Sequence, residues 1–288
     1  MKKLALLLVI IMCATLFAAC GGTVSPTPTP TAATDAPPDE TPDEVPDETP
    51  DEVTETRVFT LGFDPHFPPY GYQDDNGEYV GFDVDLATEV CARRGWELVL
   101  QPIDWDAKLF EIESGSIDCI WNGFTITEPR LLEYEWTVPY VDNSQVFVVA
   151  AESGIADKAG LAGKIVIVQT DSSAESALLS EDNAELTASF ASLDPVADYD
   201  TAFMTLVAGG ADAVAMDVGV ANYQLSQREG FVILEEALSA EQYGVGFKLG
   251  NTELRDMVQE TLLEMTADGT VDEIAEKWDL AEYVVLGK

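Results

Sequence analysis

Residues 112–130 read IESGSIDCIWNGFTITEPR, and the first part of this stretch has an echo, LVAGGADAVAMD, at residues 206–217. Each copy shows the end of a helix pattern, a glycine, a short turn, an aspartate and then an apolar strand pattern. Polar residues follow the strand in each copy, at 122–127 in the first and at Asp217 in the second. Open α/β sheets bind their ligands beyond the carboxyl ends of strands. The repeat therefore predicts two similar α/β lobes, each of which presents a binding loop.

Short β-branched runs alternate with helix patterns through the rest of the folded part. One helix pattern opens on Asp83, an expected N-cap, and stops at Gly95, while a second stops at Gly115. Asn76 and Gly77 predict the tight turn of a hairpin. This alternation predicts mostly parallel sheets with helices on both faces. The expected strands cover residues 58–63, 97–102, 117–121, 146–150, 164–168, 213–216 and 231–234.

Arg130 stands out because the chain has only 14 Lys and Arg against 53 Asp and Glu. Thr127 suits an N-cap and Pro129 suits a first helical turn, so a helix is expected to begin here. A cation at that place faces the positive end of the helix dipole unless an anion lies there too. Two interpretations stay open: a surface arginine paired with Glu128 or Glu133, or an arginine that binds a carboxylate bidentately.

Asp217 has the opposite charge and lies at the end of a buried-looking strand, where an unpaired carboxylate is costly. It either caps the next helix or meets a cation, and the two roles are compatible. Arg130 and Asp217 on facing lobes would hold a zwitterion by its carboxylate and its ammonium group. Ser172 and Ser173 add hydroxyl groups near the same cleft.

Aromatic residues follow several of the expected strands, where they become candidates for the walls of a cleft. Phe67 and Tyr70 lie in a proline-rich loop after the first strand, and Trp105 follows the second. We expect Phe67 and Trp105 to form pocket walls. Trp121, at the end of the third strand, could belong either to the pocket or to the core.

The N-terminal residues 1–20, MKKLALLLVIIMCATLFAAC, have the layout of an export signal: two lysines, an apolar run too short to span a bilayer, and a cysteine. Ala18, Ala19, Cys20 and Gly21 resemble a bacterial lipobox, in which the cysteine is lipidated and becomes the mature N-terminus. A signal cleaved elsewhere, or an uncleaved anchor, is the alternative. We therefore expect an extracytoplasmic protein that is anchored to the cell membrane by a lipid on Cys20.

Residues 21–56 contain approximate Pro-Asp-Glu repeats and no aromatic residue. Such a composition cannot bury enough apolar surface to fold, so this segment is predicted to be a disordered acidic tether. The net charge of −39 argues against nucleic acid as a partner, because binding phosphates requires a basic surface. No metal and no cofactor are expected, since the acids near Asn76 lack the complete spacing of a calcium loop. Cys91 and Cys119 are expected to be buried free thiols, with a disulfide as the alternative.

Three segments carry a resemblance to a known family: FDPHFPPYGYQDDNGEYVGFDVDLATEV (63–90), IDCIWNGFTITEPR (117–130) and YGVGFKLGNTELRDMVQETLLEMTADGTVDEIAEKWDL (243–280). Together they resemble the polar amino-acid solute-binding proteins of ABC importers, over about residues 57–288. The resemblance implies the two-lobed α/β fold of type II periplasmic binding proteins, the Venus flytrap. Its expected limits are residues 57–144 and 239–288 for lobe 1 and residues 145–238 for lobe 2, with crossings near 143–146 and 238–242.

The same resemblance assigns roles to individual residues. In this family the arginine after the T-I-T-E motif holds the α-carboxylate of the substrate, which implies this role for Arg130 with help from Thr125. The α-ammonium group is held by a backbone carbonyl at Gly123 and by the acid at Asp217. The full implied set of ligand-binding residues is Arg130, Asp217, Thr125, Gly123, Ser172, Ser173, Phe67, Trp105, Asp64 and Gln169.

Two positions depart from the family. Asp171 stands where the family often has glycine, and Gly123 replaces a frequent serine. Asp64, Gln169 and Met216 define the expected side-chain pocket. The acid at Asp64 matches one that meets basic side chains in relatives selecting lysine, arginine or histidine, but it is also widespread in the family.

The resemblance implies a monomeric receptor that binds a polar or basic L-amino acid, or cystine, and delivers it to the membrane permease of an ABC transporter. An enzyme of the same fold, such as a dehydratase, is the main alternative. We expect no catalysis, because His66 is the only histidine and leaves little scope for Ser–His or Cys–His chemistry. A sensor ectodomain is a further alternative, which the lack of a membrane exit after the folded part disfavours.

Overall fold

Three parallel strands form the centre of the first sheet, as the alternation of strand and helix patterns predicts. Strand β1 (Val58–Phe63) pairs with β5 (Glu97–Pro102) and with the short β6 (Cys119–Ile120). The antiparallel strands β14 (Gly246–Lys248) and β7 (Tyr134–Trp136) complete the order β5-β1-β6-β14-β7. This sheet is the centre of lobe 1.

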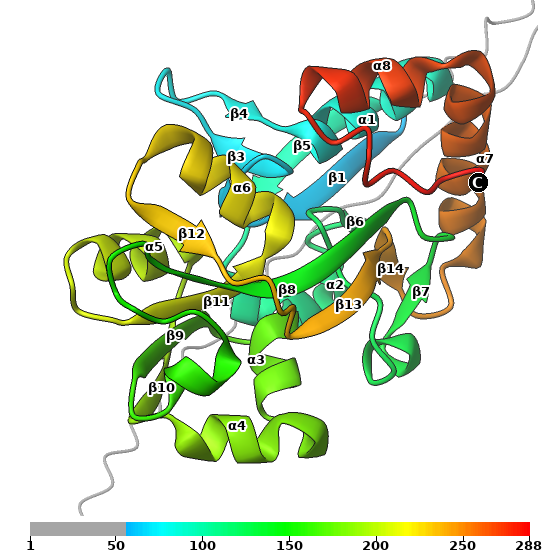
Figure 1. The fold of residues 1–288 in the computed structure, drawn as a ribbon. Helices are drawn as coiled ribbons and strands as arrows, with labels where there is room; N and C mark the ends of the chain where they lie inside the picture. Colours follow the sequence, from blue (N-terminus) through cyan, green and yellow to red (C-terminus); the bar gives the residue numbers. More distant parts are fainter. Residues whose placement is uncertain (1–55) are drawn as a thin grey trace, which may run out of the picture. The chain divides into compact units, whose positions relative to one another are not determined.

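The computed structural model describes residues 56–288, which belong to one unit (Figure 1). The expected signal peptide, Cys20 and the tether up to residue 55 therefore lie outside the described residues. Within residues 56–288, no helix combines the length and the apolar character that crossing a bilayer requires.

Helices and a small hairpin sheet surround the first sheet. The order β2-β3-β4 forms the hairpin sheet, and its turn at Gly77 has a left-handed φ of 84°, as the Asn-Gly pair predicts. The remaining elements of this lobe are β2 (His66–Phe67), β3 (Gly71–Gln73), β4 (Tyr79–Val80), α1 (Phe82–Arg94), η1 (Trp105–Ala107), α2 (Lys108–Ser114), η2 (Arg130–Leu132), α7 (Thr252–Asp268) and α8 (Thr270–Lys277).

The second sheet repeats the plan of the first and is the centre of lobe 2. Strand β9 (Ile165–Gln169) pairs in parallel with β10 (Ser192–Val196) and β11 (Ala213–Asp217). Strand β8 (Val141–Ala150) joins β11 in antiparallel fashion and also pairs with β12 (Phe231–Ile233). The helical elements are η3 (Lys158–Leu161), α3 (Ser173–Leu178), η4 (Glu181–Asn183), α4 (Ala184–Ser189), α5 (Tyr199–Val207) and α6 (Val218–Gln227).

The two predicted lobe crossings lie side by side. Strand β13 (Ser239–Tyr243) pairs with the start of β8 in antiparallel register, with Ser239 opposite Gln145 and Tyr243 opposite Val141. We call these paired residues, 141–145 and 239–243, the hinge ribbon. Strand pairing thus continues across the predicted lobe limits, because both crossings are made by strands rather than by loops (Figure 1).

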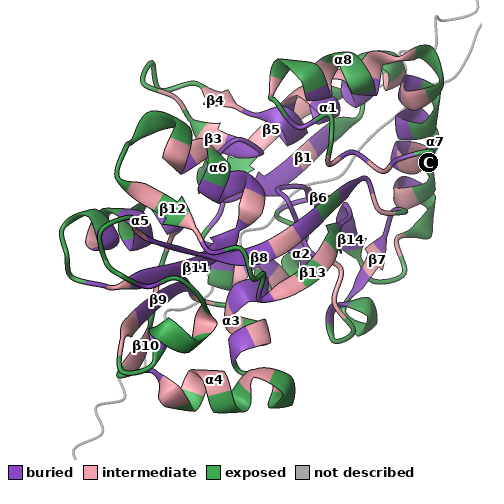
Figure 2. Cartoon of the chain, in the orientation of Figure 1, coloured by how far each residue is buried: buried purple, intermediate pink, exposed green. Residues whose placement is uncertain are grey.

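Buried residues concentrate on the strands and on the inner faces of the helices, whereas the outer faces of α4, α7 and α8 are exposed (Figure 2). Trp121 is fully buried and packs edge-on against Tyr140, so it belongs to the core. Cys91 and Cys119 are both buried and free, as expected, and no disulfide joins them.

Some local predictions were wrong. Asp83 does not cap α1: Gly81 occupies the N-cap, and the Asp83 side chain turns into the core. The expected helix at Arg130 is a 3₁₀ segment of three residues, although the Thr127 hydroxyl does accept a bond from the Arg130 amide at 3.4 Å. The strand expected over 117–121 is shorter than predicted and covers only Cys119–Ile120. Gly123, beyond its end, turns the chain with a left-handed φ of 55°.

Candidate ligand-binding site

Nine of the ten residues implied by the resemblance line one small cavity, which receives residues from both lobes. Its volume is about 10 Å³, close to that of one water-sized sphere, so its walls lie almost against each other. An amino acid would enter only if the lobes separated. The lining residues are Phe67, Trp105, Gly123, Thr125, Arg130, Gln169, Ser172, Ser173 and Asp217.

Contacts across the cleft hold the two walls together. The Thr125 and Ser173 hydroxyl oxygens lie 3.1 Å apart, although the residues belong to different lobes. Lys108 donates to the backbone carbonyl of Asp171 at 3.1 Å and forms an ion pair with its carboxylate. At the edge of the cleft, His66 Nδ1 lies 3.1 Å from Asp200 Oδ2. The structure is therefore a closed arrangement of the lobes.

Arg130 is buried and has neither of the surface partners that its sequence context allowed. Its guanidinium donates to the backbone carbonyls of Thr125 and Asp171, both at 3.1 Å. The guanidinium carbon lies 4.7 Å from the centre of the Phe124 ring. Within residues 56–288, no carboxylate forms an ion pair with it. The interpretation as a surface arginine is therefore wrong, and a buried cation without a paired anion is suited to hold an anionic ligand group.

Asp217 is buried at the start of α6 but makes no capping bond. Its Oδ1 accepts from Asn143 Nδ2 and Gln145 Nε2, both at 2.7 Å, and from the Tyr243 hydroxyl at 2.6 Å. Its Oδ2 accepts a bond from the Tyr199 hydroxyl at 3.2 Å. Neutral donors thus hold the carboxylate in place, and no cation of the described chain pairs with it.

Gly123 lies where a larger residue would not fit. A Cβ atom at this position would come within 2.6 Å of Phe67 and 3.0 Å of Tyr243. Its amide donates to the buried carboxylate of Asp83 at 2.6 Å, and the Tyr140 hydroxyl donates to the same carboxylate at 2.9 Å. Asp83 therefore fixes the backbone at Gly123. The resemblance assigns the carbonyl of this glycine to the ammonium group of the substrate. The rings of Phe67 and Tyr243 therefore leave no room at position 123 for the serine that the resemblance gives as frequent there.

Asp171 shows why the family often has glycine at its position. Its φ is 57°, in the left-handed region that most side chains avoid. Aspartate is among the residues that tolerate this conformation, and here its carboxylate meets Lys108. The turn that the resemblance assigns to anion binding therefore keeps a left-handed backbone without a glycine.

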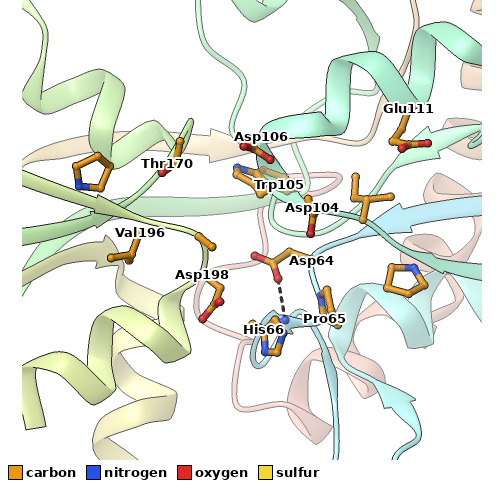
Figure 3. Close-up of a pocket in the computed structure, with 14 residues that line it drawn as sticks. Asp64, Pro65, His66, Asp104, Trp105, Asp106, Glu111, Thr170, Val196 and Asp198 are labelled. Carbon is orange, nitrogen blue, oxygen red and sulfur yellow. Dashed lines mark hydrogen bonds between the residues drawn. The ribbon is translucent and has the colours of Figure 1, made fainter. Parts of the chain in front are cut away.

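Asp64 is the one implied residue that does not line the small cavity. Its Oδ2 accepts from Gln169 Nε2 at 2.6 Å, which connects it to the cavity wall across the cleft. It instead lines an adjoining cavity of about 640 Å³ that also contains Trp105, Asp104, Asp106 and Asp198 (Figure 3). Burial raises the pKa of the Asp64 carboxyl to about 6. Met216, the third member of the expected side-chain pocket, is buried and lines neither cavity.

The serine hydroxyls have different partners. Ser172 is the N-cap of α3, and its oxygen accepts from the Glu175 amide at 3.1 Å. The Ser173 oxygen accepts from Gln145 Nε2 at 2.9 Å and donates to Glu241 Oε1 at 3.1 Å. Ser172 thus has a structural bond of its own, and Ser173 belongs to a network that includes the hinge ribbon.

The sequence reasoning missed the polar residues that surround Asp217. Alternate residues of the hinge ribbon face inward, as the burial of positions 141, 143 and 145 shows. The available signal was the polar run 142–145 directly before the apolar run 146–150, because a polar side chain that is buried requires a partner. The missed residues are Asn143, Gln145, Tyr199, Glu241 and Tyr243.

Asp83 leads to a prediction about pH. Burial raises the pKa of its carboxyl to about 7, compared with about 4 in an unfolded chain. The folded protein therefore binds this proton more tightly, and Asp83 destabilises the fold increasingly as the pH rises from about 4 to 7. We expect urea unfolding to give a free energy of unfolding about 2 kcal/mol higher at pH 5.5 than at pH 8 from this group alone.

The variant Asp83→Asn is the control for this prediction. Asp64 and Asp217, whose pKa values burial also raises, act in the same direction and remain in the variant. The difference between the two pH values should therefore shrink without vanishing. An unchanged difference would contradict the role given to Asp83.

Metal binding has no support in the described part of the chain. Within residues 56–288, no group of three or more His, Cys, Asp or Glu side chains is arranged to hold a metal ion. The acids of the hairpin bond to their own turn instead: Asp74 Oδ1 accepts from the amides of Asn76 and Glu78, both at 2.9 Å.

Known proteins are similar to this chain in both sequence and architecture. The family described as bacterial extracellular solute-binding proteins, family 3, matches residues 59–281. The L-cystine-binding protein TcyJ of Escherichia coli (strain K12) is 29% identical over 230 residues, which cover 78% of this chain and 83% of that protein. The histidine-binding periplasmic protein of Salmonella typhimurium is 28% identical over 233 residues, 76% of this chain and 86% of the relative.

Solved structures agree with this result. An ABC uptake transporter substrate-binding protein from Streptococcus pneumoniae with bound histidine has a TM-score of 0.76 and 32% identity, and the match covers 80% of this chain and 95% of that one. The arginine-binding protein of T. maritima, in a mutant form, has a TM-score of 0.71 and 32% identity, with 77% and 94% covered. These matches confirm the two-lobed type II periplasmic binding protein fold. The chain therefore belongs to the bacterial extracellular solute-binding proteins of family 3.

Proposed function

We propose that the protein binds one polar or basic L-amino acid between its lobes and delivers it to the permease of an ABC transporter. The observation that carries this proposal is the placement of opposite charges on two walls of one cavity. Arg130 belongs to lobe 1 and Asp217 to lobe 2, both are buried, and neither has a counter-ion in the described chain. A zwitterionic amino acid would supply both counter-ions, and only the closed arrangement would complete both pairs.

The relatives support the choice of an amino acid. The two curated relatives are named for cystine and histidine, and the solved structures for histidine and arginine. Asp64 beside Trp105 suits a ligand with a basic side chain, since a carboxylate attracts a cation. We propose binding without catalysis, and His66 supports this, because its partner is Asp200 rather than a serine or cysteine.

We further propose that the protein acts as a monomer and is anchored by a lipid on Cys20. The support for the anchor is the lipobox-like sequence, which lies outside the described residues. Wild-type protein is expected in the membrane fraction of the cell and the variant Cys20→Ala in the soluble fraction. Equal distribution of the two proteins would oppose the anchor.

A thermal-shift screen tests the amino-acid proposal. The probes are the twenty common L-amino acids and L-cystine, each added to the wild-type protein. A ligand at a hundred times its dissociation constant stabilises the fold by about 2.7 kcal/mol. For a folded part of this size, the melting temperature should rise by about 5–10 °C. The absence of a shift with every probe would favour another class of solute.

A further inference from the structure

Lys108 connects the two lobes from a buried position in lobe 1. It is the first residue of α2, and only 2% of its surface is exposed. Its ammonium group lies 4.9 Å from the centre of the Trp105 ring and donates to the Trp105 carbonyl at 3.1 Å. Its other two partners, the carbonyl and the carboxylate of Asp171, belong to lobe 2. All three N–H donors of the lysine therefore have acceptors, and two of these acceptors lie across the cleft.

The turn that carries Asp171 is fixed within lobe 2. The Asp171 amide donates to Glu175 Oε2 at 2.6 Å, while the Glu175 amide donates to the Ser172 hydroxyl at 3.1 Å. These two bonds hold the left-handed φ of 57° in place. The Asp171 carbonyl then accepts from Lys108 Nζ and from Arg130 Nη2, both at 3.1 Å. The turn therefore presents a carbonyl and a carboxylate to the buried cations of lobe 1.

The exposure of the charged groups makes this ion pair the stronger of the two that cross the cleft. The Lys108 side chain is 3% exposed and that of Asp171 is 56% exposed, so water is excluded from one side of the pair only. Separation of the lobes would remove both lobe 2 acceptors from the lysine, and bonds of a charged donor are about twice as strong as neutral ones. In the pair of His66 and Asp200, both side chains are about half exposed, and such surface pairs contribute little.

We propose that Lys108 and Asp171 form a latch between the lobes, which favours their closure with or without substrate and slows the release of a bound amino acid. The carboxylate is the part of the latch that this chain adds, because glycine, which the resemblance gives as frequent at position 171, would offer only its carbonyl. The kinetic effect of the latch rests on the proposed amino-acid function. Its effect on closure does not.

The variant Asp171→Gly tests the effect on closure. It removes the carboxylate, and it should fold because glycine adopts a left-handed φ readily. Small-angle X-ray scattering of the full chain without added amino acid should give a larger radius of gyration for this variant than for the wild type, and an equal value would overturn the proposal. Asp279→Gly is the matched control, since Asp279 has the same φ of 57°, is exposed and forms no ion pair within residues 56–288. It should scatter like the wild type.

The dissociation rate of the substrate tests the effect on release. An amino acid can leave the cavity only when the lobes separate, so loss of the latch should speed its exit. For each probe of the thermal-shift panel that binds, we expect dissociation at least about tenfold faster from Asp171→Gly than from the wild type, as for the loss of one charged hydrogen bond. Trp105 lines the cavity, so stopped-flow tryptophan fluorescence can follow the release. An unchanged rate would overturn the proposal.

A double-mutant cycle shows whether Asp171 acts through Lys108. The variant Lys108→Met keeps a long side chain at this buried position and removes its charge. If the two residues form one latch, Asp171→Gly should speed dissociation much less in the Lys108→Met protein than in the wild type. An equal acceleration in both proteins would show that the carboxylate acts without the lysine, and it would overturn the latch.

These measurements separate the latch from the proposed function. If the wild type bound no probe of the panel, the amino-acid function would be refuted, and the scattering comparison would still decide the latch. If probes bind but Asp171→Gly matches the wild type in scattering and in dissociation rate, the latch is refuted and the proposed function stands.

Discussion

Replacing Arg130 by alanine is expected to abolish amino-acid binding and to leave the fold in place. Within residues 56–288, Arg130 is the only buried cation without an ion pair, because the other, Lys108, pairs with Asp171. The substrate carboxylate would therefore lose its cationic partner. Removing one member of a buried charge pair costs about 3–5 kcal/mol, which corresponds to a loss of affinity of roughly 10²–10³-fold or more. Titration calorimetry with the amino acids found in the thermal-shift screen measures this loss.

The fold should tolerate this substitution because burial of the guanidinium is itself unfavourable. Burial lowers the pKa of Arg130, which shows that the protein interior disfavours its charge. The matched control is Arg57→Ala, which also removes an arginine beside an aromatic ring, Trp96, but outside the cavity. That variant should bind as the wild type does. Unaltered affinity in Arg130→Ala would remove the basis of the site assignment.

Replacing Asp217 by asparagine is expected to weaken binding by about a hundredfold or more. The substitution removes the charge that faces the ammonium group, and a buried charged partner contributes several kcal/mol. The new amide group would also meet the donors of Asn143, Gln145 and Tyr243, which now point at a carboxylate oxygen. A donor facing donors leaves at least one of them unpaired.

Asp194→Asn is the control for this prediction, because Asp194 is exposed on β10 and lines no part of the cavity. Calorimetry should show wild-type affinity in that variant. An Asp217→Asn protein that is folded by circular dichroism and binds normally would exclude Asp217 as the partner of the ammonium group.

Local sequence patterns predicted the individual strands better than their pairing. The runs over 58–63 and 97–102 form β1 and β5 with the expected limits, although β1 is largely buried and β5 is an edge strand whose residues are exposed or half-buried. The extension of β8 to Val141 was not visible, because its first residues are polar. Their strand partner, β13, lies about a hundred residues further along the chain, and pairing at that separation leaves no local pattern.

The candidate site, too, could be predicted only in part from the sequence. The residues next to strand ends, such as Arg130 and Asp217, could be singled out because charge in an apolar context requires a partner. Their chemical setting could not be predicted, since it depends on Asn143, Gln145 and Glu241, which the hinge ribbon brings beside them. The helix expected at Arg130 was also wrong, so its burial, rather than a helix dipole, is what makes the lone cation significant.

Two analogues of the substrate test the central claim, that Arg130 and Asp217 hold the two charged groups of one amino acid. The wild-type protein is titrated with the amino acid that gives the largest thermal shift, with its methyl ester and with its α-hydroxy analogue. The ester lacks the carboxylate charge and the hydroxy analogue lacks the ammonium group. The account predicts that each analogue binds at least about a hundredfold more weakly than the amino acid. Equal affinity for the amino acid and either analogue would contradict it.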